Sequence, residues 1–540
     1  MRPATTVFSH PLFLVFASSA LYIVSYDMPA YAWPLGLVAL VPFFFFLYNE
    51  QSVKRLFWYG FLFGTVIIAG TTVWFLSTYP LEWAGIGNRF VAGIIVLAVW
   101  TATSVILGLF FAFFSVLFKK LVHHDWRDLL LVPSLWVLME FSRALALSAF
   151  FLGNQSSLGP DWIFGFFGYS LVWSPLLARL APWGGVYLLS FIGVAINYAF
   201  FLALRQMRGG NKAKMVFLTA GALIVVISAG QLISLIQTQK ISGETATVAI
   251  ITTNFPAAFM PGFLSIGEQS TTIERLLDEA MLSSPDIIVL PEDSRALSYL
   301  GTTTVERILN REDKEVLLID SGPVPDPSGT RERIFFYSSS RGIIGTSDKA
   351  FLMPYGEYLP QVAVTTANLF GLQEWLSAFQ DSRGYQKGEN AIPVSFRGHM
   401  LGALFCSEII PESPYRSLAN DGAEIFFNIA SHADFHTNEK VLYNQTLSLA
   451  KMKSASNGRF FIQAGNYMPS FFLNEHGDIL GESARGENSV LLAEVGFNTR
   501  KTFYTRRGDW ILLIAILVVT FSAQMMLQRD MARDQSRANR

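Results

Sequence analysis

The chain has 540 residues, of which 51% are hydrophobic and only 15% are charged, and its mean hydropathy is +0.38. This composition excludes an ordinary soluble domain and indicates a membrane protein. The formal net charge of -1 excludes the strong basic field that nucleic-acid partners require, and the single cysteine excludes a disulfide within the chain.

Eight apolar stretches are candidates for membrane-spanning helices, because most approach the ~20 residues that a helix needs to cross ~30 Å of hydrocarbon. They are residues 8–26, 34–48, 56–76, 90–118, 129–150, 183–204, 215–236 and 509–527. The second is short enough to be an internal or tilted helix. We expect the first to be retained, because it is too long for a signal-peptide core and further helices follow it. Within the fifth, Glu140 and Arg143 are predicted to compensate each other inside the bundle.

Basic residues in the short loops orient this bundle, because Lys and Arg accumulate on the cytoplasmic side. One side carries Arg2, Lys54, Arg55, Lys119, Lys120, Arg127, Arg205, Arg208, Lys212, Lys214, Arg529, Arg533, Arg537 and Arg540. The opposite short loops carry only Arg89 and Arg179. Both termini are therefore predicted to be cytoplasmic, and residues 237–508 are predicted to lie outside, which in a bacterium with an outer membrane is the periplasm.

The predicted domains follow from this pattern. Residues 1–236 form a bundle of about seven helices, residues 237–508 form an extracytoplasmic domain, residues 509–527 form a C-terminal transmembrane helix, and residues 528–540 form a cytoplasmic tail.

The sequence pattern of residues 237–508 predicts a soluble α/β domain, because short β-branched runs alternate with segments of helical periodicity. "ATVAIITTN" predicts a strand, and "TIERLLDEAML" has apolar residues at helical spacing. "PDIIVLPED" and "HMLGALFCSEII" each predict a buried strand that ends at a polar residue or turn.

Three chemically competent residues follow apolar strands in this domain. Glu292 closes "IIVLPE", Lys349 lies in "GTSDKAFLMPYGEYLP", and Cys406 closes "LGALFC". Strand ends are where α/β enzymes present reacting groups, so these residues predict a nucleophilic site. Proton transfer from a thiol of pKa ~8.5 to a carboxylate of pKa ~4.3 is unfavourable. Burial would raise the pKa of the Glu292 carboxyl and so reduce this difference. The ammonium of Lys349 would stabilise the thiolate and then the oxyanion of the tetrahedral intermediate.

The same residues carry a resemblance to a known family. "LPE", "K…PYGEYLP" and "FCSEII" resemble the Glu, Lys and Cys motifs of the nitrilase superfamily, in the form found in bacterial apolipoprotein N-acyltransferases. The segments "FGYSLVWSPLLARLAPWGGVYLLSFIGVAIN" at 167–197 and "TFYTRRGDW" at 502–510 are similar to that family's flanking membrane segments. The resemblance covers nearly the whole chain.

The resemblance implies a multi-pass α-helical inner-membrane bundle of about eight helices with an inserted nitrilase-like αββα sandwich. It implies ping-pong transfer of an acyl chain from a phospholipid donor to the N-terminal amine of a diacylated lipoprotein cysteine. Cys406 would carry the acyl group as a thioester, Glu292 would be the general base and Lys349 would support the oxyanion. Glu357 and Glu408 match supporting acids of the family. Neither a metal nor a cofactor is implied, and we expect a monomer.

Several positions depart from the family pattern. Ala257 and Pro261 stand where the family has Gln and Trp, "SHADFH" at 431–436 stands for Asn-Asp-Ala-Trp-Phe, and Ser407 replaces a frequent Tyr. These changes concern the lining of the site more than the three catalytic residues. They therefore affect the expected preference for the acyl donor or acceptor more than the expected chemistry.

Other interpretations stay open at this stage. Glu357 and Glu408 are also consistent with ordinary surface or capping acids, and His432, Asp434 and His436 with metal ligands on one face. The apolar segment 351–379 is either an arm that touches the bilayer or a cover for the domain core. The chain as a whole could be a membrane-tethered amidase or nitrilase that releases its acyl group to water, or a non-catalytic scaffold. The number of helices before the domain favours lipid substrates.

Overall fold

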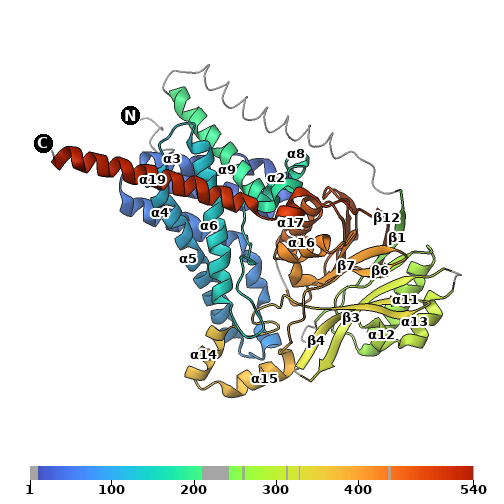
Figure 1. Ribbon diagram of the computed structural model, residues 1–540. Helices are drawn as coiled ribbons and strands as arrows, with labels where there is room; N and C mark the ends of the chain where they lie inside the picture. The colour runs from blue at the N-terminus through green and yellow to red at the C-terminus, as the bar shows by residue number, and fades with distance from the viewer. Residues whose placement is uncertain are drawn as a thin grey trace, which may run out of the picture.

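The computed structural model describes residues 10–208, 243–257, 262–311, 314–327, 329–435 and 439–538. A helical bundle and an α/β domain lie side by side in it, and the long C-terminal helix leads back from the domain and crosses the bundle (Figure 1).

The bundle is built from apolar helices. Its helices and turns are α1 (Pro11–Asp27), α2 (Pro29–Gly36), α3 (Val41–Asn49), α4 (Val53–Thr71), η2 (Val73–Thr78), η3 (Leu81–Ala84), α5 (Arg89–Leu121), α6 (Asp128–Phe150), α7 (Gly168–Leu171), α8 (Pro175–Ala178), α9 (Ala181–Arg208), α18 (Phe503–Arg507) and α19 (Trp510–Ala538). Among the described residues, six segments are long and apolar enough to cross a membrane: Pro29–Asn49, Val53–Thr71, Arg89–Leu121, Asp128–Phe150, Ala181–Met207 and Trp510–Arg537. The shorter Pro11–Asp27 is also apolar.

Seven of the eight predicted stretches correspond to these apolar segments, and the predicted helix 215–236 lies outside the described residues. The second predicted stretch, 34–48, is interrupted: α2 ends at Gly36 and α3 begins at Val41. Each of these two helices has a proline in its first turn, the position at which proline favours helix initiation.

Local sequence explains how two long helices begin and bend. The side chain of Asn88 caps α5 by accepting hydrogen bonds from the backbone N–H groups of Phe90 and Val91. α9 is kinked at Gly184 and Gly185, whose backbone angles are not helical. Gly185 has φ +60°, and a Cβ there would lie 2.6 Å from the ring of Tyr504, so only glycine allows α18 to approach this closely.

The α/β domain contains two six-stranded sheets within the described residues. The strands are β1 (Thr245–Thr252), β2 (Ile287–Val289), β3 (Leu317–Asp326), β4 (Gly329–Ser338), β5 (Gly342–Asp348), β6 (Val394–Phe396), β7 (His399–Phe405), β8 (Ile425–Ser431), β9 (Phe460–Asn466), β10 (Phe471–Leu473), β11 (Ile479–Glu482) and β12 (Ser489–Gly496). The first sheet has the order β12-β1-β2-β3-β4-β5, and the second has the order β11-β10-β9-β8-β7-β6.

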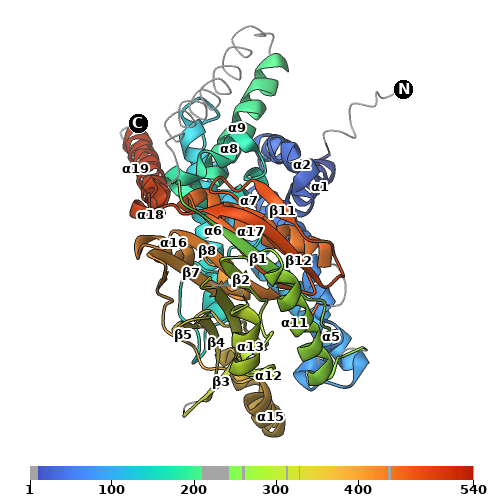
Figure 2. The same cartoon turned by 90° about the vertical axis from the view of Figure 1, so that its right-hand side faces the viewer.

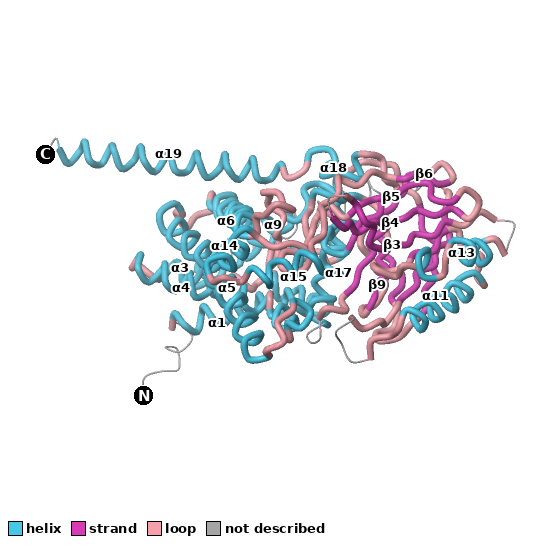
Figure 3. Tube along the Cα trace, turned by 90° about the horizontal axis from the view of Figure 1, so that it is seen from below, coloured by secondary structure: helices cyan, strands magenta, loops and turns pink. Residues whose placement is uncertain are grey.

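Helices cover the outer faces of both sheets. They are α11 (Ile266–Met281), α12 (Ala296–Tyr299) and α13 (Thr302–Leu309) on one side, and α16 (Ser413–Asn420) and α17 (Glu439–Asn457) on the other. Figures 2 and 3 show α11 and α13 on the outer face, away from the bundle. One apolar core lies between α11–α13 and the first sheet, and a second lies between the two sheets. This layering is the predicted αββα sandwich.

A third apolar core is continuous from the membrane bundle to α16, α17 and the second sheet. Polar contacts cross the same interface. Gln445 of α17 donates to the carboxylate of Asp27 at 2.9 Å and to the carbonyl of Thr71 at 2.7 Å, and Trp173 donates to Ser448 at 2.7 Å. The inner helical layer of the sandwich is therefore also part of the packing of the bundle.

Two helices form an arm at the bottom of Figure 1, below the bundle: α14 (Gln361–Leu369) and α15 (Gln373–Arg383). Leu369, Phe370 and Leu372 are exposed on it. Trp375 instead donates a hydrogen bond of 3.1 Å to the carbonyl of Ala84 in η3, so the arm contacts a loop of the bundle.

Glu140 and Arg143 are both buried in α6, as the predicted compensation inside the bundle requires. Glu140 accepts from the backbone N–H of Phe167 at 2.7 Å, and Arg143 donates to the carbonyl of Gly165 at 3.1 Å. The opposite charges of Glu140 and Arg143 also act on each other, so the two side chains compensate each other as predicted, while the 165–167 segment supplies a backbone partner to each.

Candidate active site

The three residues predicted to be catalytic converge at one edge of the sandwich. The Nζ of Lys349 lies 2.9 Å from Oε1 of Glu292. Ser431 connects the third residue: its carbonyl oxygen lies 3.7 Å from the Sγ of Cys406, and its N–H donates to Oε2 of Glu292 at 3.1 Å. The nucleophile and the base therefore share one backbone neighbour.

Sheet topology explains this convergence. Glu292 follows β2 and Lys349 follows β5. β2 is parallel to β3, and β3, β4 and β5 are successively antiparallel, so β2 and β5 run in the same direction. In the second sheet β7 and β8 are parallel, so their carboxyl ends bring Cys406 and Ser431 together. The site forms where these ends of the two sheets meet.

Glu357 is a second carboxylate partner of Lys349. Its Oε1 lies 2.6 Å from the Nζ of Lys349, and its Oε2 accepts from the backbone N–H of Met353 at 2.7 Å. The side chain of Lys349 is only 3% exposed. Two carboxylates thus fix a buried ammonium in one orientation.

Glu408 connects the two segments that carry Lys349 and Cys406. Its Oε1 accepts from the N–H of Ala350 at 2.9 Å, and its Oε2 accepts from the N–H of Phe405 at 2.8 Å. Ser407 adds a further link by donating to the carbonyl of Phe351 at 2.6 Å. Glu357 and Glu408 thus belong to the hydrogen-bond network around Lys349 and Cys406.

The electrostatics of the site favour a neutral thiol at rest. Burial, followed by the charge of Glu292, raises the pKa of Cys406. Burial also raises the pKa of Glu292 above its ordinary value, which makes this carboxylate a stronger base. Burial alone would lower the pKa of Lys349, but the charges of Glu292 and Glu357 outweigh it and raise the pKa. Lys349 is thus an ammonium, with a base and a nucleophile beside it.

Sequence reasoning missed two residues at this site, Ser431 and Glu332. Ser431 ends the strand that neighbours β7, and this pairing is not visible in the sequence. Glu332 occupies an inward-facing position of β4, where its backbone carbonyl accepts from the N–H of Lys349 at 2.9 Å. The alternation in "RERIFF", with Glu, Ile and Phe on one face, is a signal that could have identified it.

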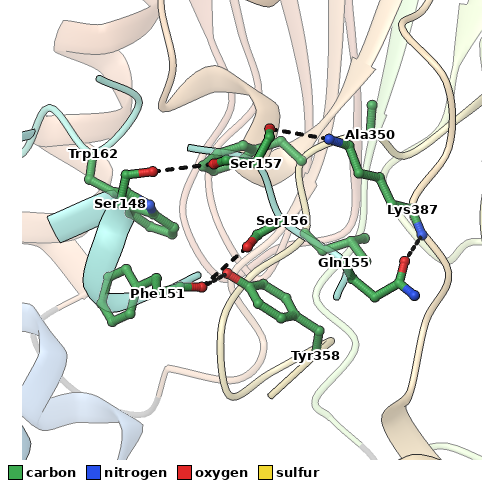
Figure 4. Close-up of a pocket in the computed structure, with 11 residues that line it drawn as sticks. Ser148, Phe151, Gln155, Ser156, Ser157, Trp162, Ala350, Tyr358 and Lys387 are labelled. Atoms are coloured by element: carbon green, nitrogen blue, oxygen red, sulfur yellow. Dashed lines mark hydrogen bonds between the residues drawn. The ribbon is translucent and has the colours of Figure 1, made fainter. Parts of the chain in front are cut away.

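A small recess adjoins the site between the bundle and the domain (Figure 4). Residues 148–162 of the bundle line one side, and Ala350, Phe351, Leu352, Tyr358 and Lys387 line the other. The Nζ of Lys387 donates to Ser157 at 3.3 Å, and Tyr358 donates to the carbonyl of Phe151 at 2.8 Å. The segment that follows Lys349 is therefore anchored on the bundle.

The segment with the family departures is only partly described. His432 is buried, and burial lowers its pKa to about 3, so its imidazole is neutral. Phe435 packs against it and against Trp74 of the bundle. Pro261 and His436 lie outside the described residues. Among those described, no group of three His, Cys, Asp or Glu side chains is placed to hold a metal ion.

Comparisons with known proteins agree with this arrangement. Residues 18–199 match the model of the apolipoprotein N-acyltransferase N-terminal domain, and residues 308–503 match the model of the carbon-nitrogen hydrolase family. The apolipoprotein N-acyltransferase of Pseudomonas syringae pv. tomato is 26% identical over 508 residues, which cover 90% of this chain and 91% of the relative. That of Geobacter metallireducens is 25% identical over 510 residues, which cover 91% of this chain and 90% of the relative.

Among solved structures, a Nesterenkonia amidase of the nitrilase superfamily covers 49% of this chain and 92% of its own, at 14% identity and a TM-score of 0.35. That likeness is too weak to support an argument about this chain. Relatives that span about 90% of the chain, together with the two matched domains, show that it belongs to the apolipoprotein N-acyltransferase family.

Proposed function

We propose that this membrane enzyme transfers an acyl chain from a phospholipid to the N-terminal amine of a diacylated lipoprotein cysteine, through a thioester on Cys406. The observation that carries the proposal is the convergence of Glu292, Lys349 and Cys406 in a domain packed onto apolar helices. The relatives named for lipoprotein N-acylation support the same reaction.

In the first half-reaction, Glu292 takes the proton of the Cys406 thiol as Sγ attacks the ester carbonyl of the donor. An ammonium has three N–H groups, and two of those of Lys349 face Glu292 and Glu357. The remaining one can stabilise the oxyanion of the tetrahedral intermediate. The C–O bond then breaks, the leaving oxygen takes the proton from Glu292, and the lysophospholipid departs.

In the second half-reaction, the lipoprotein amine attacks the thioester carbonyl and Glu292 takes its proton. Collapse of the intermediate breaks the C–S bond and leaves an amide, and the proton on Glu292 returns to the sulfur. The same three side chains thus serve both halves, and each half ends with the site in its starting protonation state.

The proposed setting is a bacterial inner membrane with the domain of residues 237–508 in the periplasm and both termini in the cytoplasm. The loop charges of the bundle support this orientation. The exposed side chains of Leu369, Phe370 and Leu372 on the arm support contact with lipid beside the site. We propose that the protein acts as a monomer and that residues 509–527 return the chain across the membrane.

Mass spectrometry of the purified protein tests the central step. Protein mixed with phospholipid and no acceptor should gain the mass of one fatty acyl chain, and hydroxylamine should remove it, as it removes a thioester. The adduct should persist because a transferase must shield its thioester from water, and a diacylated lipopeptide should then discharge it. Cys406→Ala should not load.

Matched variants identify the roles of the other two residues. Glu292→Gln and Lys349→Met should lose loading by at least about 100-fold, because the base or the oxyanion partner is missing. Glu306→Gln, the same chemical change on the outer helix α13, should load like the wild type. Rapid loss of the acyl group to water would instead identify a hydrolase, and a protein that never loads would identify a scaffold. Loading that survives Cys406→Ala would show that the nucleophile is another residue.

A further inference from the structure

Glu332 occupies a position in β4 that normally belongs to an apolar residue. Alternate residues of a strand share a face, and Ile334 and Phe336, on the same face as Glu332, belong to the core between the two sheets. Glu332 itself is only 5% exposed. An ionised carboxylate at such a position is costly unless it is paired.

The strand register places this carboxyl beside the catalytic lysine. β4 and β5 are antiparallel with Arg333 opposite Asp348, and the N–H of Lys349 continues the ladder by donating to the carbonyl of Glu332. Residues that lie opposite each other on antiparallel strands have their side chains on the same face. Glu332 and Lys349 therefore face the same space.

Lys349 does not neutralise Glu332, because the positive charge of Lys349 is already paired with two other carboxylates. Lys349 contacts Glu292 and Glu357 at 2.9 and 2.6 Å, so these three groups together carry one net negative charge. Oε2 of Glu332 is buried without a hydrogen-bond partner. An ionised Glu332 would add a second negative charge, for which the cluster of Glu292, Lys349 and Glu357 has no counterion.

The charged and titratable groups that act on Glu332 lie on three segments around it. They are Glu292, Asp293 and Arg295 after β2, Lys349 and Glu357 after β5, and Tyr385 before β6. Tyr385 also forms a side-chain hydrogen bond with Glu332. Asp293 and Arg295 pair with each other at 2.6 Å. Burial, together with the charges of Asp293 and Glu292, raises the pKa of Glu332 well above its ordinary value. The geometry and the charges thus agree on a protonated carboxyl.

We propose that Glu332 is a positioning residue of the site that acts as a neutral carboxylic acid, and that its ionisation at alkaline pH disfavours the thiolate of Cys406. As a neutral acid it leaves the cluster of Glu292, Lys349 and Glu357 with one negative charge. Once ionised, it adds a second negative charge, against which both the thiolate and the oxyanion must form. The inference rests on Cys406 as the proposed nucleophile, but its test does not require acyl transfer.

The single cysteine of the chain makes the test specific. The alkylation rate of Cys406 by iodoacetamide reports its thiolate fraction and can be followed from pH 6 to pH 10 on the full-length protein in detergent. Glu332→Gln is neutral at every pH and so reproduces the protonated acid. We expect this variant and the wild type to react at equal rates at neutral pH. At the alkaline end the variant should react about tenfold faster, which corresponds to one unit in the pKa of the thiol.

Two results would overturn the inference. A variant that already reacts about tenfold faster at pH 7 would mean that Glu332 is ionised at rest. Equal rates at every pH would mean that the group does not act on Cys406. Glu306→Gln, on the outer helix α13, is the matched control and should follow the wild type throughout. Thermal unfolding of Glu332→Gln establishes that the variant is folded, and acyl loading of the wild type tests the proposed function separately.

Discussion

Glu408 shows how a single carboxylate can maintain the spacing of a catalytic site. Each of its oxygens accepts one backbone N–H, and the two donors belong to the segments that follow Lys349 and precede Cys406. Only the ionised form offers two acceptor oxygens without a competing hydroxyl donor. Burial raises the pKa of Glu408 to about 7, so protonation in the weakly acidic range should disturb this link.

Glu408→Gln should therefore lower acyl loading by about 10-fold or more, since the amide NH₂ faces a backbone N–H and leaves it unpaired at a cost of about 1–3 kcal/mol. For the same reason, loading by the wild type should fall as the pH drops below about 7, where Glu408 gains a proton. Single-turnover loading followed by mass spectrometry measures both effects.

The control for this prediction, Glu424, directly precedes β8 and lies beside the end of β7 that is opposite to Cys406. Glu424 accepts from the N–H of Met400 at 3.2 Å and contacts His399 at 2.8 Å, far along β7 from Cys406. Glu424→Gln should lower the melting temperature without changing the loading rate. If both variants load equally well, Glu408 has no role beyond stability.

At the residue scale, sequence located the groups that strand ends expose. Glu292, Lys349 and Cys406 each follow an apolar run, and such a run predicts both a strand and the place where it ends. Ser431 could not be found this way, because its contacts depend on the parallel pairing of β7 and β8. Glu332 lies inside a strand, where a charged residue is normally assigned to the solvent face.

At the element scale, the structure divides the apolar segment 351–379 into two parts. Leu369 and Phe370 are 80% and 72% exposed, as expected for an arm that touches lipid. Trp375 instead donates a hydrogen bond to the carbonyl of Ala84. The ring of Trp83 lies 5.1 Å from the guanidinium of Arg383. The outer part of the arm is free, and the inner part is attached to the bundle.

Leu369→Ser combined with Phe370→Ser should reduce loading from lipid bilayers several-fold while leaving the melting temperature unchanged. The two side chains contribute apolar area to a membrane contact and not to the core. Loading from vesicles, compared with loading from a short-chain phospholipid in detergent, isolates the effect. Equal loss on both donors would argue against a membrane contact.

Trp375→Phe is the matched change on the attached part of the arm. It keeps an aromatic ring but removes the donor to Ala84, so it should loosen the arm and affect both donors alike. An effect confined to vesicles would assign Trp375 to the membrane surface as well.

Long, uniformly apolar helices could be predicted from the sequence, but a break within an apolar segment could not. A helix such as α5 is apolar around most of its circumference and is unambiguous from composition. The break between α2 and α3 depends on where the chain turns inside the bundle, although Pro29 and Pro42 mark the first turn of each helix.

At the scale of the whole molecule, the union of bundle and domain could not be foreseen. Gln445 reaches Asp27 and Thr71, which are far away in sequence, and no local pattern marks such partners. Periodicity and resemblance predicted the layers of the sandwich. That α17 packs against both the second sheet and the bundle depends on three-dimensional packing and could not be predicted in this way.

The orientation in the membrane gives a prediction at this scale. A reporter fused after Arg208 or Arg540 should report the cytoplasm, and one inserted near Ser328 should report the outside, because the loop charges favour this topology. Ser328 and Arg540 lie outside the described residues, and the described residues on either side of Ser328 include Asp326 and Gly329, which pair between β3 and β4. Alkaline phosphatase and green fluorescent protein should give opposite signals at each position. A cytoplasmic signal near Ser328 would overturn the proposed topology.

The pairing of β1 with β12 places the beginning and the end of the inserted domain side by side, with Thr245 opposite Gly496. Bringing together the ends of a free loop of roughly 250 residues would cost about 5 kcal/mol in chain entropy. Here the folding of the domain closes that loop, so the chain enters and leaves the domain at neighbouring points. Entry and exit at neighbouring points allow a whole domain to stand between two membrane helices, even though its helix α17 packs against the bundle.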